Sequence, residues 1–317
     1  MMSKVSPPSG GRGGAVMDLG TNTFHLLIAG DTANGFEAIV REQVAVKLGE
    51  GGIDKGIIRP EAFERGLHTI KSFRDKIDAH NVQNIRAIAT SAVRNASNGP
   101  AFIEKVKKET GISIEVIDGE TEAGFIYQGI RATGLLSNEN ALIMDIGGGS
   151  IEFIICNVSR ISWKQSFEIG AARLMERFHR TDPIPPDSVE ALELYLENAL
   201  TNLFDAVKTT PLLDLIGSSG SFETFAELIE SEQNDTFDLA QIKRYAFDLE
   251  DLLQVTGKLL ASSHSERAAN SLIIPVRVDM IVVSAVVTRY IIRRLGIRNV
   301  ALSTYSLKEG VLAEMIK

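Results

Sequence analysis

One segment, residues 142–153, constrains the fold of this chain more than any other. It reads Leu-Ile-Met-Asp-Ile-Gly-Gly-Gly-Ser-Ile-Glu-Phe, which predicts an apolar strand ending near Asp145, a glycine-rich turn, and a second apolar strand carrying Glu152. Successive backbone N–H groups in such a turn can form an anion-binding concavity, and glycines permit conformations that side chains forbid. Carboxylate oxygens suit Mg²⁺. The segment therefore indicates phosphate chemistry, and a tight hairpin with two solvated acids is the alternative for this motif alone.

A second segment, residues 15–29, repeats the pattern near the N-terminus. An apolar strand delivers Asp18, and another apolar strand follows the turn. The turn consists of small and polar residues, which are Gly20, Thr21, Asn22 and Thr23. Their hydroxyls and amide can donate to phosphate oxygens where glycines do so in the later loop. The matched order predicts an internally duplicated protein, in which each half presents one phosphate loop to a shared cleft.

The patterns around the two hairpins predict the domain organisation. Strand patterns alternate with helical ones, which indicates a mixed sheet with helical crossovers and hence an α/β fold. Residues 1–13, rich in Pro, Gly and Ser, predict a flexible leader. The predicted domains cover residues 14–133 and 134–305, with a hinge at 134–140, and a closing helix covers 306–317.

Composition narrows the class of protein. The single cysteine, Cys156, excludes an internal disulfide, and the absence of an N-terminal apolar segment argues against secretion, so we expect a cytoplasmic location. Residues 272–292 are apolar-rich but contain Arg277, Asp279 and Arg289, which predicts a buried helix rather than a membrane span. With a net charge of −8, any site for a polyanion must concentrate its cations locally. Neither a nucleic acid nor a membrane is expected as a partner.

Seven segments in order resemble the exopolyphosphatase/guanosine pentaphosphate phosphatase (Ppx/GppA) family, within the superfamily of actin, sugar kinases and large heat-shock chaperones. They are residues 18–23, 89–98, 117–123, 145–152, 166–174, 217–221 and 306–310. The resemblance runs from about residue 15 to the C-terminus. It implies two ribonuclease H-like (actin-like) domains with an interdomain cleft, the closing helix packed on the first domain, and a possible homodimer. The chain looks like a short form, since longer members carry an additional C-terminal domain.

The resemblance also suggests the catalytic residues. Glu122 aligns with the second acid of a Gly-x-Glu-Glu-Ala pattern, so we expect it to orient or deprotonate the attacking water. Thr121 stands in place of the first acid, and Lys308 stands where an Arg often does. Arg94 is expected to clamp phosphate with its planar guanidinium fork. Without the resemblance, Glu122 is an ordinary acid of a helix's first turn and Arg94 a solvated loop arginine.

Metal and phosphate ligands complete the expected site. Asp145 and Glu152 are the best candidates for binding Mg²⁺ or Mn²⁺, and Asp18 is a weaker one that could instead hold water or the loop. Each could alternatively be a turn-capping Asp or an exposed strand Glu. The expected phosphate-binding residues are Gly20, Thr21, Asn22, Thr23, Arg94, Gly147, Gly148, Gly149 and Ser150.

These expectations converge on a metal-dependent phosphoanhydride hydrolase. It would release terminal phosphate from inorganic polyphosphate or guanosine pentaphosphate by carboxylate-assisted attack of water, and it would bind polyphosphate or guanosine penta- and tetraphosphate. The sequence ranks neither substrate above the other. An ATP-dependent kinase of the same superfamily is an alternative, because residues 217–221 resemble its adenosine loop. A non-catalytic nucleotide or alarmone sensor is another.

Overall fold

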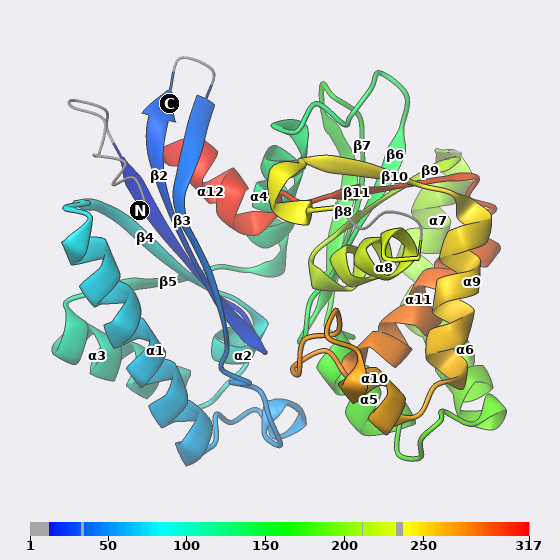
Figure 1. Ribbon diagram of the computed structural model, residues 1–317, viewed down its shortest axis with the longest axis horizontal. Coiled ribbons are helices and arrows are strands. Elements are labelled where there is room, and N and C mark those ends of the chain that lie inside the picture. The colour runs from blue at the N-terminus through cyan, green and yellow to red at the C-terminus, as the bar shows by residue number, and fades with distance from the viewer. Residues whose placement is uncertain (1–12, 33–34, 211, 233–236, 317) are drawn as a thin grey trace. The chain divides into compact units, whose positions relative to one another are not determined.

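The computed structural model describes residues 13–32, 35–210, 212–232 and 237–316, so all but the last residue of the expected leader lie outside it. The chain divides into two compact units (Figure 1). The first unit comprises Met1–Asp118 with Leu307–Lys317, and the second comprises Gly119–Ser306. Each unit contains one sheet.

The first unit contains a five-stranded sheet in the order β3-β2-β1-β4-β5. The strands are β1 (Gly14–Leu19), β2 (Thr23–Thr32), β3 (Gly35–Ala45), β4 (Asn84–Ala89) and β5 (Ile114–Val116). The β1–β2 and β2–β3 pairs are antiparallel, and the β1–β4 and β4–β5 pairs are parallel. The unit's helical elements are η1 (Ile53–Lys55), α1 (Pro60–Ala79), α2 (Ser91–Arg94), α3 (Gly99–Thr110) and α12 (Leu307–Met315).

Helices cover both faces of this first sheet. Helix α1 starts at Pro60, where the missing N–H costs nothing, and buries Leu67, Ile70 and Phe73 as its periodicity predicts. Their cluster includes Met17 of β1. Helix α12 packs on β1 and β2 (Figure 1). Because Gly14 faces Leu312 of α12, that helix covers the face opposite Met17.

The second unit contains a six-stranded sheet in the order β10-β11-β9-β6-β7-β8. The strands are β6 (Ala141–Ile146), β7 (Ile151–Cys156), β8 (Ile161–Phe167), β9 (Asp214–Ser218), β10 (Arg244–Phe247) and β11 (Asn299–Ser303). Strand β6 pairs antiparallel with β7 on one side and parallel with β9 on the other. In the first sheet, β1 pairs in the same way with β2 and β4. The repeated arrangement confirms the α/β class and the expected duplication of the hairpin.

Helices pack against both faces of the second sheet. The helical elements are α4 (Gly119–Arg131), α5 (Ala171–Phe178), α6 (Pro186–Ala199), α7 (Thr201–Thr209), α8 (Gly220–Glu230), η2 (Leu239–Gln241), α9 (Leu249–Ala261), α10 (His264–Ala269) and α11 (Met280–Leu295). One face, with Leu142, Met144 and Phe153, joins the large apolar core that also contains most of α11. Among the described residues, no helix is long and apolar enough to cross a membrane.

Helices α6 and α7 are interrupted at Leu200, and strand β10 lies among the helices of residues 238–293. One expected detail of the fold needs correction. The apolar run at 272–292 is helical only from Met280, because the segment before it forms turns.

One helix in each unit follows, in sequence, the strands of the other unit. Helix α4 follows the strands of the first sheet but packs on β7 and β8, and the Tyr127 hydroxyl donates to the carbonyl oxygen of Asn157 at 3.0 Å. Helix α12 follows the strands of the second sheet but packs on β1. The boundary therefore lies before α4, at 118/119, rather than at the expected 133/134, and the expected hinge at 134–140 connects two elements of the second unit. Chain order alone does not predict which sheet an amphipathic helix covers.

Candidate active site

The two acids of the glycine-rich hairpin face each other across the strands. Asp145 of β6 pairs directly with Glu152 of β7. In the same row, Ser218 of β9 pairs with Asp145, and Ser166 of β8 pairs with Glu152. Directly opposed residues project from the same face of a sheet, so these four side chains form a polar row. The sequence predicted both acids, but the row depends on register across strands that are distant in the chain.

The acids of this polar row are buried and held by hydroxyl groups. Asp145 is 6% exposed and Glu152 is 1% exposed. The Ser166 hydroxyl donates to Glu152 Oε1 at 2.6 Å, and the Ser306 hydroxyl donates to Asp145 Oδ2 at 3.0 Å. These bonds fix the orientation of the carboxylates. Two adjacent carboxylates beside hydroxyl oxygens are hard oxygen ligands, and such a donor set fits a divalent cation.

Ser218 adds a further polar group to the row. Its side chain is completely buried, and its hydroxyl oxygen has no hydrogen-bond partner among the described residues. Buried hydroxyls nearly always bind something, so an isolated one beside a carboxylate indicates a place for a water or ligand oxygen. The sequence singled out residues 217–221 for their resemblance to the family and to the adenosine loop of the kinases, and gave Ser218 itself no role. The next residue, Ser219, has φ 70° and ψ 179°, a region that is almost exclusively glycine's.

The glycine-rich loop turns its carbonyl groups away from any ligand. The carbonyl oxygens of residues 147–149 accept bonds from the N–H groups of residues 170–172, at 2.9–3.1 Å, where α5 starts. Arg173 Nε also donates to the Gly149 oxygen at 2.9 Å. Among the described residues, no backbone oxygen accepts a bond from the N–H groups of residues 148 and 149. These N–H groups are therefore suited to an anion, and phosphate binding by this loop stays a prediction.

The glycines in and around this loop are required by close packing. None of residues 147–149 has a positive φ, so the conformational reason given for them in the sequence analysis is wrong. A Cβ atom on Gly170 would lie 2.4 Å from the carbonyl carbons of Gly148 and Gly149. The start of α5 thus packs directly on the loop backbone. Gly170 lies in the segment 166–174, for which the sequence analysis assigned no role to any single residue.

The first hairpin's loop is built in a similar way. The carbonyl oxygens of Thr21 and Asn22 accept from the N–H groups of Gly49 and Lys47, at 3.0 and 2.7 Å. Thr21 is buried, whereas Asn22 and Asp18 are half-buried. Asp18 pairs with His25 across the β1–β2 hairpin. Both loops therefore have carbonyl groups tied back by a neighbouring segment.

The two expected catalytic side chains lie on different units. Glu122 is in the first turn of α4 and only 7% exposed, which separates it from the ordinary solvated acid of a first turn. Helix α4 starts against the polar row, because a Cβ on Gly119 would lie 2.2 Å from Ser166 Cβ. Arg94 ends α2 in the first unit, where its Nη1 donates to the Ile117 carbonyl oxygen at 2.9 Å.

Comparison with known proteins decides the family. The sequence model of the Ppx/GppA phosphatase family matches residues 27–317, which is most of the chain. The chain belongs to the Ppx/GppA phosphatase family. This confirms the resemblance drawn from the seven sequence segments.

Individual relatives of the Ppx/GppA family agree with this assignment. An exopolyphosphatase from Cytophaga hutchinsonii ATCC 33406 is 42% identical, with a TM-score of 0.94 over 96% of this chain and 97% of that one. The Aquifex aeolicus family member, 23% identical, shares the fold with a TM-score of 0.80 over 96% of this chain and 97% of its own. These neighbours confirm the two-domain, actin-like fold class.

A curated Ppx/GppA relative is longer than this chain. The guanosine-5'-triphosphate,3'-diphosphate pyrophosphatase of Photobacterium profundum is 27% identical over 308 residues. The match covers 95% of this chain but only 59% of that relative. The shared part contains the two-sheet core in which all the site residues described above lie.

Proposed function

We propose that this protein is a metal-dependent phosphoanhydride hydrolase that removes terminal phosphate from inorganic polyphosphate, guanosine pentaphosphate, or both. The observation that carries the proposal is the polar row, in which two buried carboxylates oppose each other beside a loop with outward N–H groups. Family membership and the names of the relatives support the same chemistry.

Asp145 and Glu152 would hold Mg²⁺ or Mn²⁺. Opposed residues on antiparallel strands have Cβ atoms roughly 5 Å apart, so two carboxylates in this register can serve one cation. Ser166 and Ser306 would act as positioning residues that keep the carboxylates in place, and Ser218 would bind a water or phosphate oxygen. The bound cation would offset negative charge on the phosphoryl oxygens. Asp18 is a weaker metal candidate because it lies on the other unit.

The phosphate chain would be bound by loop N–H groups and a guanidinium. In the second unit, the groups are residues 147–150 at the turn of the β6–β7 hairpin. In the first unit, they are residues 20–23 and Arg94. Backbone N–H groups are fixed in direction and need no reorientation when a phosphate binds.

Glu122 would orient or deprotonate the attacking water. Its burial keeps the carboxylate out of bulk water, and its position at the start of α4 puts it on the helix that begins against Ser166. Thr121 stands in place of the first acid of the family pattern, so the residue directly before Glu122 is not a carboxylate. The cytoplasmic location and the homodimer expected from the sequence stay predictions.

A substrate comparison tests the proposal. The purified chain is incubated with polyphosphate, guanosine pentaphosphate and ATP, each with Mg²⁺, with Mn²⁺ and with a chelator, and released phosphate is measured. We expect metal-dependent release from at least one of the first two. If neither substrate releases phosphate but phosphate is transferred from ATP to an added acceptor, the protein is a kinase and not the proposed hydrolase. If guanosine pentaphosphate binds with neither release nor transfer of phosphate, the protein is a non-catalytic sensor.

A further inference from the structure

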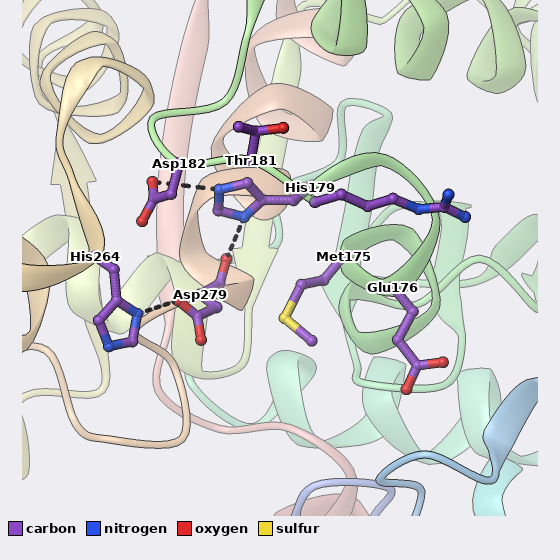
Figure 2. A pocket seen from close by; sticks show the side chains of 8 residues that line it. Met175, Glu176, His179, Thr181, Asp182, His264 and Asp279 are labelled. Atoms are coloured by element: carbon purple, nitrogen blue, oxygen red, sulfur yellow. Dashed lines mark hydrogen bonds and ion pairs between the residues drawn. The ribbon is translucent and has the colours of Figure 1, made fainter.

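A second group of metal-binding side chains lies in the second unit, away from the polar row. It lines a pocket of about 290 Å³ (Figure 2). His179 caps the end of α5, and Asp182 follows in the connection to α6. His264 is the first residue of α10, and Asp279 precedes α11. The pocket thus gathers the ends of three helices and one connecting loop, and none of its residues enters the proposed hydrolysis.

Three of these side chains are close enough to share one ion, and His179 adjoins them through Asp182. Ligand atoms of Asp182, His264 and Asp279 all lie within 4.8 Å of one another. His264 Nδ1 lies 2.6 Å from Asp279 Oδ1. His179 lies between the two aspartates in Figure 2, with Nε2 3.4 Å from Asp182 Oδ1 and Nδ1 3.3 Å from the Asp279 carbonyl oxygen.

The buried histidine of this pocket is the observation that points to a ligand. The His179 side chain is only 3% exposed, and its Nε2 has no hydrogen-bond partner among the described residues. Because a carbonyl oxygen only accepts, Nδ1 must carry the ring hydrogen. In the neutral ring, the lone pair of Nε2 then faces an Asp182 oxygen that also has no hydrogen to give. A metal cation between the two atoms would satisfy both, as would a protonated ring that donates to Asp182.

The contact between His179 and Asp182 matches a protein metal site, whereas the 2.6 Å between His264 Nδ1 and Asp279 Oδ1 is a direct hydrogen bond that a metal ion would replace. Metal-binding histidines commonly donate the other ring N–H to a backbone carbonyl, as His179 does. In a tetrahedral zinc site with bonds of about 2.1 Å, neighbouring ligand atoms lie about 3.4 Å apart. The 3.4 Å between His179 Nε2 and Asp182 Oδ1 agrees with that separation. We propose that His179, Asp182, His264 and Asp279 bind a Zn²⁺-class divalent cation that fastens the ends of α5, α10 and α11 together.

Arg267 competes with a metal ion for the carboxylates of Asp182 and Asp279. It is 2% exposed and binds Asp182 through two bonds, at 2.8 and 3.1 Å, while its Nη2 lies 3.6 Å from Asp279 Oδ1. A carboxylate has about four acceptor positions, so this bidentate contact leaves positions for a metal and fixes the Asp182 orientation. Imidazole with carboxylate favours zinc over Mg²⁺, which prefers oxygen ligands alone.

The test is a Zn²⁺ titration of the full chain. Protein stripped with a chelator is titrated against a chromophoric zinc indicator, with excess Mg²⁺ present to saturate the polar row. We expect one tightly bound Zn²⁺ per chain and a rise in melting temperature, since a ligand that binds only the folded state stabilises it. His264→Gln and His179→Gln should each weaken binding by more than about 100-fold, beyond the effect of losing an indirect partner. His68→Gln, an exposed histidine of α1, is the matched control and should bind as the wild type does.

Three results would overturn the site. They are the absence of saturable Zn²⁺ binding, unchanged affinity in both histidine variants, and loss of binding in Asp145→Asn, which would place the ion in the polar row. If His179→Gln fails to fold, the exposed His264 still decides: unchanged Zn²⁺ affinity in His264→Gln rules the site out. In each of these cases Arg267 and the two aspartates form an ordinary ion-pair cluster.

Discussion

Ser166→Ala is the most informative single substitution in the polar row. The Ser166 hydroxyl lies 2.6 Å from Glu152 Oε1, which is in the short range of hydrogen bonds to a charged oxygen. Alanine removes this donor but keeps the Cβ atom that packs against Gly119. The substitution therefore changes how Glu152 is held without changing how α4 packs.

The expected magnitude follows from the burial of Glu152. Hydrogen bonds to charged groups contribute about 1.5–3 kcal/mol, and water cannot readily replace the lost donor at a carboxylate that is 1% exposed. We expect the free energy of unfolding of the metal-free protein to fall by about 1.5–3 kcal/mol. Losing an indirect partner of a metal ligand typically costs about 10–100-fold in affinity. The Mg²⁺ concentration for half-maximal phosphate release should rise by that factor, while the rate at saturating Mg²⁺ recovers.

Two measurements on one preparation check this expectation. Denaturant unfolding in the presence of chelator gives the stability, and phosphate release across a Mg²⁺ series gives the metal dependence. Ser231→Ala is the control, because it removes a 2.9 Å hydroxyl bond to the Leu228 carbonyl oxygen in the same unit. Lower stability with an unchanged Mg²⁺ dependence would refute the reasoning, since Glu152 would then be a structural acid.

Three further predictions follow from individual side chains. Glu122→Gln should lower turnover by about 10²–10⁴-fold with substrate binding kept, measured by phosphate release and ligand titration; a folded variant with near wild-type turnover would exclude Glu122 as the base. Arg94→Ala should cost about 3–4 kcal/mol in turnover of every phosphate substrate, and Arg94→Lys should recover only part, because the planar fork is lost; unchanged turnover would make Arg94 a solvated arginine. Hydrogen bonds from Arg294 and Tyr290 lower the pKa of Glu197 to about 2, so this contact stabilises the fold above the unfolded pKa of about 4.3 and is lost as pH falls from there towards 2. Glu197→Gln should therefore be less stable than wild type at pH 7 and converge with it in acid, and a difference that persists at pH 2 in denaturant unfolding would contradict this linkage.

The sequence predicted the hairpins and their acids because those features are local. Alternating apolar residues, one Asp and a glycine-rich turn specify β6 and β7 without reference to the rest of the chain. Helix α1 was equally clear from Pro60 and its apolar periodicity. The short strand β10, Arg-Tyr-Ala-Phe, has no such pattern and exists because it pairs with β11.

What the sequence could not supply was register and long-range pairing. Three serines join the two acids only through long-range pairing. The register of β8 on β7 places Ser166, the register of β9 on β6 places Ser218, and the chain after β11 returns to β6 with Ser306. All three serines lie in segments that resemble the family, but nothing local gives any of them a role beside the acids. The packing of α4 and α12 on sheets that are distant in the chain is a tertiary outcome, and the His179 pocket gathers residues from three separate helix ends and a connecting loop.

The Mg²⁺ dependence of phosphate release by Asp145→Asn and Glu152→Gln, beside the wild type, tests the central claim most directly. Both substitutions keep the size of the side chain and remove one negative charge from the polar row. We predict that wild-type release disappears with chelator and returns with Mg²⁺, and that neither variant recovers wild-type release at Mg²⁺ concentrations that saturate the wild type. Folded variants that release phosphate at the wild-type rate, with the wild-type Mg²⁺ dependence, would contradict the assignment of these two carboxylates as the metal ligands.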